Sequence, residues 1–516
     1  MTLTMKASCT MLTALLLCGV SATVAALAPM PPQDAAAIPA HPGDLAFPDL
    51  DFTPPVGAEY RHVLSNGVPV YVVPSHEFPL ISLSFTFKGG EYLLDQDQVG
   101  LNGALGGQMR RGGTTSVKPD DLDEQLDFLA ANVSTSVGGE VSGASIDCLK
   151  ANFDEAFALF MDIVRNPGFD QEKLRLFQDQ VIEGFETRND NPMGVAMPTV
   201  SRLAFGEDHY SSWEATKDSI EAITPEALRE LHGRIFHPGN LIISVTGDVE
   251  PAEILAKLET AFEGWSALEA NPDPPKPAHD LSPGMYHSRT TQADLPQGTT
   301  LLIGKGIQRD DPDAIALRIM NDILGGGGFT SRVTNRIRSD EGLAYTAVTQ
   351  MQPQFWYDGL FFGFFQSKNS TVALAAKLMI EEIERIKAEE VTEEELRVAK
   401  EALIQSFPQR FASKGAMLGV FVNDEMTDRD PEYWANWRDK VRAVDAAAVQ
   451  RVAQEHLHPD QMALLVVGDW DAIEVGDLEG RASMQDFFDG DVEHLPMLDP
   501  LTREPMDEDE DDAAKP

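Results

Sequence analysis

The chain has few basic residues and no long apolar run after its N-terminus. Its 516 residues include 40 Lys and Arg against 83 Asp and Glu, which gives a formal net charge of −43. Binding to a phosphate backbone needs clustered Lys and Arg, so this balance argues against nucleic acid as a partner. A membrane-spanning helix needs about 20 consecutive apolar residues. The chain offers none beyond the N-terminus, so no membrane span is predicted.

Cysteine is also scarce, and the positions of the three cysteines exclude a disulfide framework. Cys9 and Cys18 lie in an N-terminal segment whose apolar stretch, residues 11–20, follows Lys6 and precedes small residues. This pattern is typical of a secretory signal, so residues 1–28 are predicted to be removed and the mature protein to be periplasmic or secreted. Cys148 then stands alone in an alternating run typical of a half-buried strand, which leaves neither a disulfide nor a Cys-rich metal site.

What the sequence does contain is an internal repeat. Residues 236–248, FHPGNLIISVTGD, return at residues 457–469 as LHPDQMALLVVGD, an offset of 221 residues. The helices expected before the two copies begin at Thr224 and Asp445, both of which are N-cap residue types. Self-similarity at a fixed offset is the signature of a duplicated unit, so two copies of one α+β domain are predicted.

Local signals divide the chain further. Asn66-Gly67 between two apolar runs predicts a β-hairpin. The prolines of residues 271–283 exclude both a helix and a central β-strand there. The like-charge run 507–512 predicts a disordered tail. The predicted divisions are a signal peptide (1–28), a loosely ordered segment (29–54), a first domain (55–270), a Pro-rich linker (271–290), a second domain (291–480) and an acidic tail (481–516).

Five motifs carry a resemblance to a known family. They are NGVPVYVV (66–73), GGEY (89–92), GL (100–101), FHPGN (236–240) and RSDEGLAY (338–345). In this order they resemble the insulinase/pitrilysin-type zinc metallopeptidases, and most closely their two-domain bacterial and mitochondrial-processing-peptidase branch. The resemblance implies an α+β fold of two insulinase-like domains, each a mainly antiparallel sheet packed with helices and joined by the Pro-rich linker.

The helix that carries zinc in active members of that family has lost its chemistry here. Those members have His-x-x-Glu-His, in which the histidines bind zinc and the glutamate activates water. The corresponding positions are Gly103, Gly106 and Gly107, which can neither coordinate a metal nor accept a proton. The family's third ligand falls at about Glu183, with Glu186 a less favoured alternative. A single carboxylate does not hold catalytic zinc, so a solvated helix glutamate is expected and no cofactor is predicted in this chain.

The second domain keeps a different motif. In active relatives an Arg and a Tyr seven residues apart reach towards the zinc-bound substrate, and Arg338 and Tyr345 match that pair in spacing and context. An Arg donates several hydrogen bonds to peptide carbonyls, and a Tyr hydroxyl stabilises a developing oxyanion. The alternative is structural, with Tyr345 half-buried at a strand entry and Arg338 complementing a helix end. The glycine run 325–328 lacks the ending of a phosphate loop and predicts a flexible turn.

The chain lacks the family's zinc ligands but keeps the Arg338/Tyr345 pair. In this combination it resembles one subunit of a heterodimeric zinc metallopeptidase. The predicted function is therefore the non-zinc subunit, which is inactive alone and helps to bind and cleave unfolded peptides with a zinc-bearing His-x-x-Glu-His partner. The alternative is a non-catalytic peptide-binding or scaffold protein with the same fold. A stand-alone protease is the least favoured interpretation, because all three groups of the zinc helix are missing.

Overall fold

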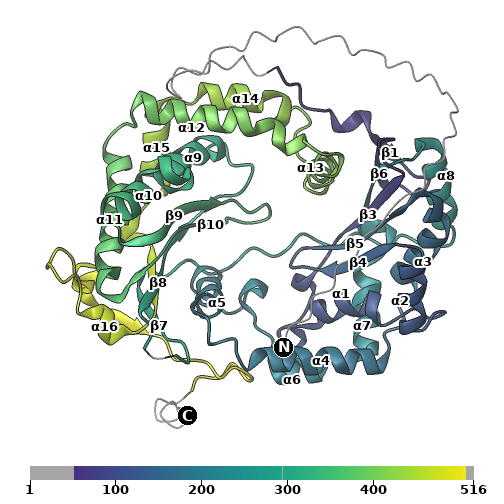
Figure 1. The fold of residues 1–516 in the computed structure, drawn as a ribbon, viewed down its shortest axis with the longest axis horizontal. Coiled ribbons are helices and arrows are strands. Elements are labelled where there is room, and N and C mark those ends of the chain that lie inside the picture. Colours follow the sequence, from purple (N-terminus) through teal and green to yellow (C-terminus); the bar gives the residue numbers. More distant parts are fainter. Residues whose placement is uncertain (1–50, 293, 507–516) are drawn as a thin grey trace, which may run out of the picture. The chain divides into compact units, whose positions relative to one another are not determined.

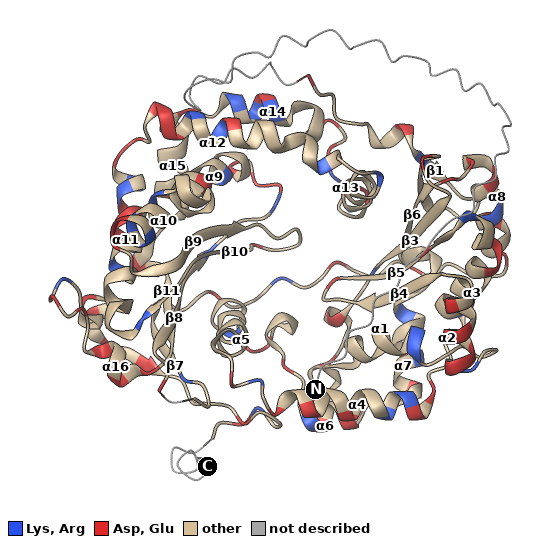
Figure 2. Cartoon of the chain, viewed as in Figure 1, with Lys and Arg blue, Asp and Glu red and all other residues tan. Residues whose placement is uncertain are grey.

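A computed structural model describes residues 51–292 and 294–506, and nearly all of these lie in one compact unit, Phe52–Pro516. The predicted signal peptide, most of the segment 29–54 and the acidic run 507–512 lie outside the described residues. Figure 2 shows Asp and Glu on most helices, with Lys and Arg interspersed. No helix among the described residues is long and apolar enough to cross a membrane.

The first half of the unit forms a six-stranded sheet in which only the β2–β6 pair is parallel (Figure 1). Its strands, in spatial order, are β1 (Arg61–Val63), β2 (Pro69–Pro74), β6 (Leu241–Gly247), β3 (Leu80–Lys88), β5 (Val141–Leu149) and β4 (Asn132–Val137). Its helices are α1 (Leu101–Arg111), α2 (Pro119–Phe128), α3 (Phe153–Arg165), α4 (Gln171–Phe185), α5 (Pro192–Phe205), α6 (Lys217–Glu221), α7 (Pro225–Ile235) and α8 (Pro251–Ala261).

The second half forms another six-stranded sheet, in which the β12–β7 and β7–β11 pairs are parallel. Its strands, in spatial order, are β12 (Val492–His494), β7 (Gly284–Ser288), β11 (Ala463–Val467), β8 (Gln297–Lys305), β10 (Leu360–Lys368) and β9 (Ala344–Gln352). Its helices are α9 (Ala314–Asn321), α10 (Arg332–Thr334), α11 (Val372–Ala388), α12 (Glu393–Ser406), α13 (Lys414–Met426), α14 (Tyr433–Ala443), α15 (Ala446–His456) and α16 (Trp470–Glu474).

The predicted duplicated α+β fold is confirmed by these topologies. The order β2-β6-β3-β5-β4 in the first sheet is repeated by β7-β11-β8-β10-β9 in the second. Asn66-Gly67 joins β1 to β2 as an antiparallel hairpin. Thr224 and Asp445 cap α7 and α15, because their side chains accept hydrogen bonds from the third residue of each helix. Cys148 is buried on β5, where burial raises the pKa of the thiol to about 11, as fits a packed core residue.

Two of the predicted boundaries are wrong. Strand β7 begins inside the predicted linker 271–290, because the prolines end at Pro283 and an apolar strand follows directly. The predicted tail 481–516 contains β12, which pairs with β7. The acidic composition of this segment concealed three apolar residues that join the second core: Ala482, Met484 and Phe487.

One helix of each half packs on the sheet of the other half. On α13, Leu418 and Phe421 are buried against Tyr71 and Ile242 of the first sheet. The ring of Phe421 lies with its centroid 5.7 Å from that of Tyr71, and Glu425 Oε2 accepts a 2.6 Å hydrogen bond from the Tyr71 hydroxyl. The second half therefore supplies part of the cover of the first sheet.

The reverse contact is made by α5, which belongs to the first half. Ala196 and Val200 are fully or almost fully buried against Leu301 and Leu465 of the second sheet. The bounds of α5 and α13 differ by 221–222 residues, close to the sequence repeat, so the two helices are equivalent elements of the two copies. The copies thus exchange one helix in each direction.

The exchange makes a prediction for Phe421→Ala. Phe421 is 3% exposed, and removing a buried ring leaves a cavity between the halves. We expect the free energy of unfolding to fall by about 3–5 kcal/mol, measured by urea denaturation. Phe128→Ala is the matched control, since that ring is 85% exposed and its loss is expected to change stability by less than about 0.5 kcal/mol. Equal effects of the two substitutions would contradict the packing described here.

Candidate functional site

The glycine-rich helix α1 packs directly on the edge strand β4. Gly103 is exposed and Gly107 is half-buried, whereas Gly106 is buried. A Cβ atom on Gly106 would lie 2.8 Å from the backbone nitrogen of Val137, closer than any relaxed contact. The hydroxyl of Thr135 also donates a 2.5 Å hydrogen bond to the Gly106 carbonyl. The backbone of β4 therefore takes the room that a side chain at position 106, the family's glutamate position, would need.

The residues expected around a zinc ion are not gathered into a site. Glu183 and Glu186 are exposed at the end of α4. Among the described residues, the one group of three His, Cys, Asp or Glu side chains close enough to share a metal is Asp313, Glu455 and His456. Arg451 forms ion pairs of 2.6 Å with both carboxylates of that group, which accounts for the cluster as a charge network.

The structure brings Arg338 and Tyr345 together, with one further aromatic residue. The Arg338 guanidinium carbon lies 4.3 Å from the centroid of the Tyr345 ring and 4.6 Å from that of Phe329. Tyr345 is 81% exposed and Phe329 is 66% exposed, so the stack faces solvent. Stacking occupies the flat face of a guanidinium and leaves its N–H groups, which lie in the plane, free to donate hydrogen bonds.

Phe329 was not predicted as a site residue, although its position in the sequence gave a signal. It directly follows the glycine run 325–328, and an aromatic side chain placed there has neither helical nor strand periodicity to bury it. Two π-helical segments, Asp322–Gly326 and Asn335–Asp340, flank this region. Such segments are rare and are found frequently at functional sites.

The first glycine of the run is buried and tightly packed, whereas a flexible turn was predicted for the whole run. A Cβ atom on Gly325 would lie 2.5 Å from the backbone nitrogen of Thr349 on β9. Gly328 has a φ of +62°, a left-handed conformation that favours glycine. Glycine is therefore required here for a close approach to β9 and for the turn that positions Phe329.

Buried hydrogen bonds hold the same loop on β9. The Asn321 side chain donates to the Thr349 carbonyl and accepts from the Thr349 hydroxyl, at 3.2 and 2.9 Å. The hydroxyl of Thr334 donates a 2.8 Å bond to the Ala347 carbonyl. Because buried polar groups are costly to leave unpaired, these bonds fix the loop in one position relative to the strand that carries Tyr345.

A bidentate ion pair connects the segment between α9 and β9 to α12. Arg332, whose side chain is 7% exposed, donates from Nε and Nη2 to the two carboxylate oxygens of Glu395, at 2.6 and 2.9 Å. Burial by itself raises the pKa of Glu395, but hydrogen bonds from Arg332 and Thr392 outweigh burial and lower the pKa to about 2. Sequence reasoning did not identify this pair, because its members are far apart in the chain.

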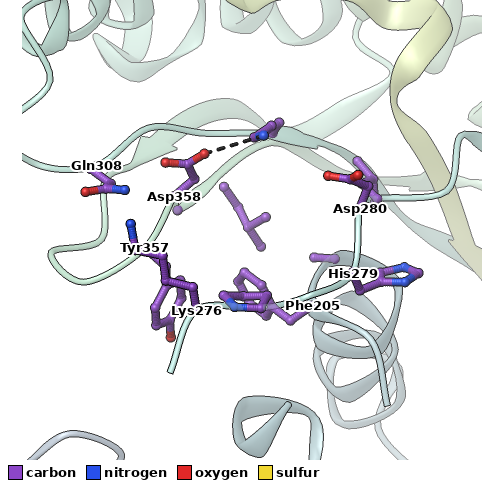
Figure 3. A pocket seen from close by; sticks show the side chains of 13 residues that line it. Phe205, Lys276, His279, Asp280, Gln308, Tyr357 and Asp358 are labelled. Carbon is purple, nitrogen blue, oxygen red and sulfur yellow. Dashed lines mark ion pairs between the residues drawn. The ribbon is translucent and has the colours of Figure 1, made fainter. Parts of the chain in front are cut away.

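A separate pocket of about 180 Å³ lies beside the linker, away from all the predicted site residues. Figure 3 shows Lys276, His279 and Asp280 around it, together with Tyr357 and Asp358. An ion pair of 3.5 Å joins Lys305 to Asp358 at its wall. Its charges of both signs and its small volume give it no evident catalytic arrangement, so Arg338, Tyr345 and Phe329 remain the candidate site.

The α1–β4 contact predicts opposite effects of one substitution at two positions. Gly106→Ala is expected to destabilise the protein by about 1–3 kcal/mol, because the new methyl group overlaps the β4 backbone. Gly103→Ala, on the same helix, meets open space and is expected to stabilise by about 0.5–1 kcal/mol. Thermal and urea denaturation of both variants would measure this. A Gly106→Ala variant as stable as the wild type would contradict the packing.

The Arg332–Glu395 pair predicts a pH-dependent stability. The pKa of the Glu395 carboxyl is lower in the folded chain than in the unfolded chain, so the ionised pair stabilises the fold at pH values above the unfolded-state pKa. This stabilisation is lost as the pH falls towards the folded-state pKa of about 2. Glu395→Gln should therefore cost about 3 kcal/mol at pH 7, with the difference from the wild type shrinking below about pH 4.5. The control Glu401→Gln removes an exposed pair with Arg397 and should cost at most about 1 kcal/mol. A pH-independent difference would disprove the pairing.

Comparisons with known proteins show which protein families the chain resembles. Residues 222–403 match the family described as "Peptidase M16 inactive domain". The "Non-peptidase homolog YmxG" of Helicobacter pylori is 27% identical over 371 residues, which span 70% of this chain and 83% of that protein. An "Uncharacterized zinc protease" of Rickettsia bellii is 23% identical over 69% of this chain and 85% of its own length.

Solved structures have the same fold. The peptidase M16 inactive domain from Pseudomonas fluorescens superposes with a TM-score of 0.69 at 23% identity, covering 79% of this chain and 97% of that one.

A more distant sequence relative is the probable mitochondrial-processing peptidase subunit beta of Arabidopsis thaliana, which is 20% identical over 67% of this chain and 66% of its own length. The motifs, the duplicated fold and these matches agree: the chain is similar to the M16, or insulinase/pitrilysin-type, metallopeptidases, and residues 222–403 match that family's inactive domain.

Proposed function

We propose that the chain is the non-zinc subunit of a heterodimeric M16 peptidase. The observation that carries the proposal is the exposed stack of Arg338 between Phe329 and Tyr345, in a chain whose α1 has no metal ligand. A purely structural Arg/Tyr pair would gain stability by burial, whereas Tyr345 is 81% exposed. The relatives include proteins named as beta and alpha subunits of mitochondrial-processing peptidase, which supports pairing between family members.

In the proposed complex this chain binds and orients the peptide. Strand β9 lies at the edge of the second sheet, and an edge strand offers backbone groups to an extended peptide. The N–H groups of Arg338 would bind a substrate carbonyl, and the hydroxyl of Tyr345 would donate to the oxygen that gains charge during cleavage. The partner's His-x-x-Glu-His helix would hold the zinc that activates water.

The test is co-expression with a relative that contains His-x-x-Glu-His, ideally one encoded next to this chain. Tyr345→Phe removes one donor to the oxyanion and should lower kcat for peptide cleavage by about 10²–10³-fold with little change in KM. Arg338→Ala should lower kcat/KM by a similar factor.

The matched control for both variants is Arg336→Ala. Arg336 lies in the same π-helical segment, and its ion pair with Glu341 is long, at 3.7 Å. We expect this variant to cleave peptides at the wild-type rate. Cleavage by the complex that is unaffected by Tyr345→Phe and Arg338→Ala would refute the shared site.

A second candidate is a peptide-binding or scaffold protein without catalysis. It is favoured by the relative named a non-peptidase homologue, which covers most of this chain. Size-exclusion chromatography with mass measurement separates the two candidates. A stable homodimer that leaves a zinc-bearing relative unbound supports the scaffold, and a one-to-one complex with that relative supports the subunit. Export to the periplasm or out of the cell, which the N-terminal sequence predicts, is part of both proposals.

A further inference from the structure

A pocket of about 530 Å³ in the second half collects four arginines. They come from separate segments: Arg309 follows β8, Arg318 lies on α9, Arg410 follows α12 and Arg429 follows α13. The chain has only 40 basic residues and a net charge of −43. A convergence of four arginines in such a chain is therefore a specific feature of this pocket.

Aromatic rings contact three of these arginines, and the guanidinium carbon of Arg309 lies 4.5 Å from the centroid of the Phe355 ring. The Arg429 guanidinium carbon lies 4.2 Å from the centroid of the Tyr433 ring and 5.2 Å from that of Trp434. Arg410 lies 5.2 Å from the centroid of Trp434 and 6.0 Å from that of Trp437. Because ring faces attract the flat face of a guanidinium, its N–H edges remain available for a ligand.

Nearby carboxylates neutralise these arginines only in part. Asp310 binds Arg309 through two hydrogen bonds and lies 3.5 Å from Arg429. Asp424, the sole carboxylate that lines the pocket, also lies 3.5 Å from Arg429.

The remaining two arginines have fewer partners. Arg318 pairs at 3.4 Å with Asp322, which lies outside the pocket. Among the described residues, no carboxylate lies within 4.0 Å of Arg410. The positive charge of Arg410 therefore has no balancing partner in that part of the chain.

Two further observations point to an anionic ligand. The side chain of Arg429 is 6% exposed, and its Nε has no hydrogen-bond partner among the described residues, since it faces Asp424 Oδ1 only as a 3.5 Å ion pair. Burial, followed by repulsion from Arg318 and Arg429, lowers the pKa of Arg410. An anion bound between these cations would accept the unused N–H groups and relieve the repulsion, so its binding gains energy from both sources.

We propose that this arginine–tryptophan pocket binds a carboxylate-bearing ligand, namely an acidic peptide segment. Guanidinium groups match carboxylates in a bidentate geometry. Apolar side chains of Ile315, Leu403 and Val420 in the lining give the aliphatic parts of such a segment a surface to cover. The excess of acidic residues elsewhere repels the same ligand, which directs it to this pocket. The site is separate from Arg338 and Tyr345 and does not depend on the proposed function.

The test uses tryptophan fluorescence and calorimetry on the full chain. The probes are acetyl-Glu-Glu-Leu-Glu-Glu-amide, the same peptide with every Glu replaced by Gln, and citrate as a free carboxylate. We expect the Glu peptide to bind saturably and to quench or shift the emission of Trp434 and Trp437. The Gln peptide should bind at least about 10-fold more weakly, because it lacks the charges that the arginines recognise.

Variants locate the binding. Arg410→Gln and Arg318→Gln should each weaken binding of the Glu peptide by about 10-fold. Arg410→Gln should leave the melting temperature unchanged or higher, since it removes repulsion, whereas Arg318→Gln also removes the partner of Asp322. Arg397→Gln is the control, because Arg397 lies on α12 and is paired with Glu394 and Glu401. Citrate binding that equals peptide binding and also depends on Arg410 supports the carboxylate site with a free acid as its ligand. The absence of saturable binding at about 10 mM, or binding insensitive to both pocket variants, overturns the proposal.

Discussion

The exchange of α5 and α13 between the two repeats is the contact on which the rest of the structure depends. Each sheet buries one face under helices of its own repeat and receives one helix of the other repeat as additional cover. Because apolar surface on either sheet would be exposed if the exchanged helix left, the two copies are coupled by the hydrophobic effect. The described part of the chain accordingly forms one compact unit and not two independent domains.

In both repeats a glycine allows a segment to pack closely on the edge strand of the sheet, with different consequences. In the first, Gly106 lets α1 approach the backbone of the edge strand β4, and in the second, Gly325 lets the loop after α9 approach β9. The first contact fills the space of a catalytic side chain, whereas the second positions Phe329 beside Arg338. One repeat therefore has a helix without metal ligands, and the other has a half-buried guanidinium beside two exposed rings.

Sequence reasoning succeeded where local patterns determine structure. The Asn66-Gly67 hairpin, the strand that carries Cys148 and the caps at Thr224 and Asp445 follow from turn chemistry, alternation and capping, and the repeat supplied the fold class. It failed for the segment 481–506, where local charge density suggested a tail although a few apolar residues anchor the chain in the second core.

The candidate site was predictable only in part. The loss of metal ligands at α1 and the Arg338/Tyr345 pair were readable from motif spacing, and the structure adds that the pair is in contact. The helix exchange, the Arg332–Glu395 pair and the arginine–tryptophan pocket join residues remote in sequence. No periodicity or spacing encodes such contacts, because they depend on how the elements pack in three dimensions.

In the proposed peptidase this chain contributes substrate-binding groups and no metal. Zinc content, measured by mass spectrometry on the purified complex with a His-x-x-Glu-His relative and on this chain alone, is the decisive measurement. We expect about one zinc per two chains in the complex and less than about 0.1 zinc per molecule of the chain alone. Stoichiometric zinc in the isolated chain, or two zinc ions in the complex, would contradict this expectation.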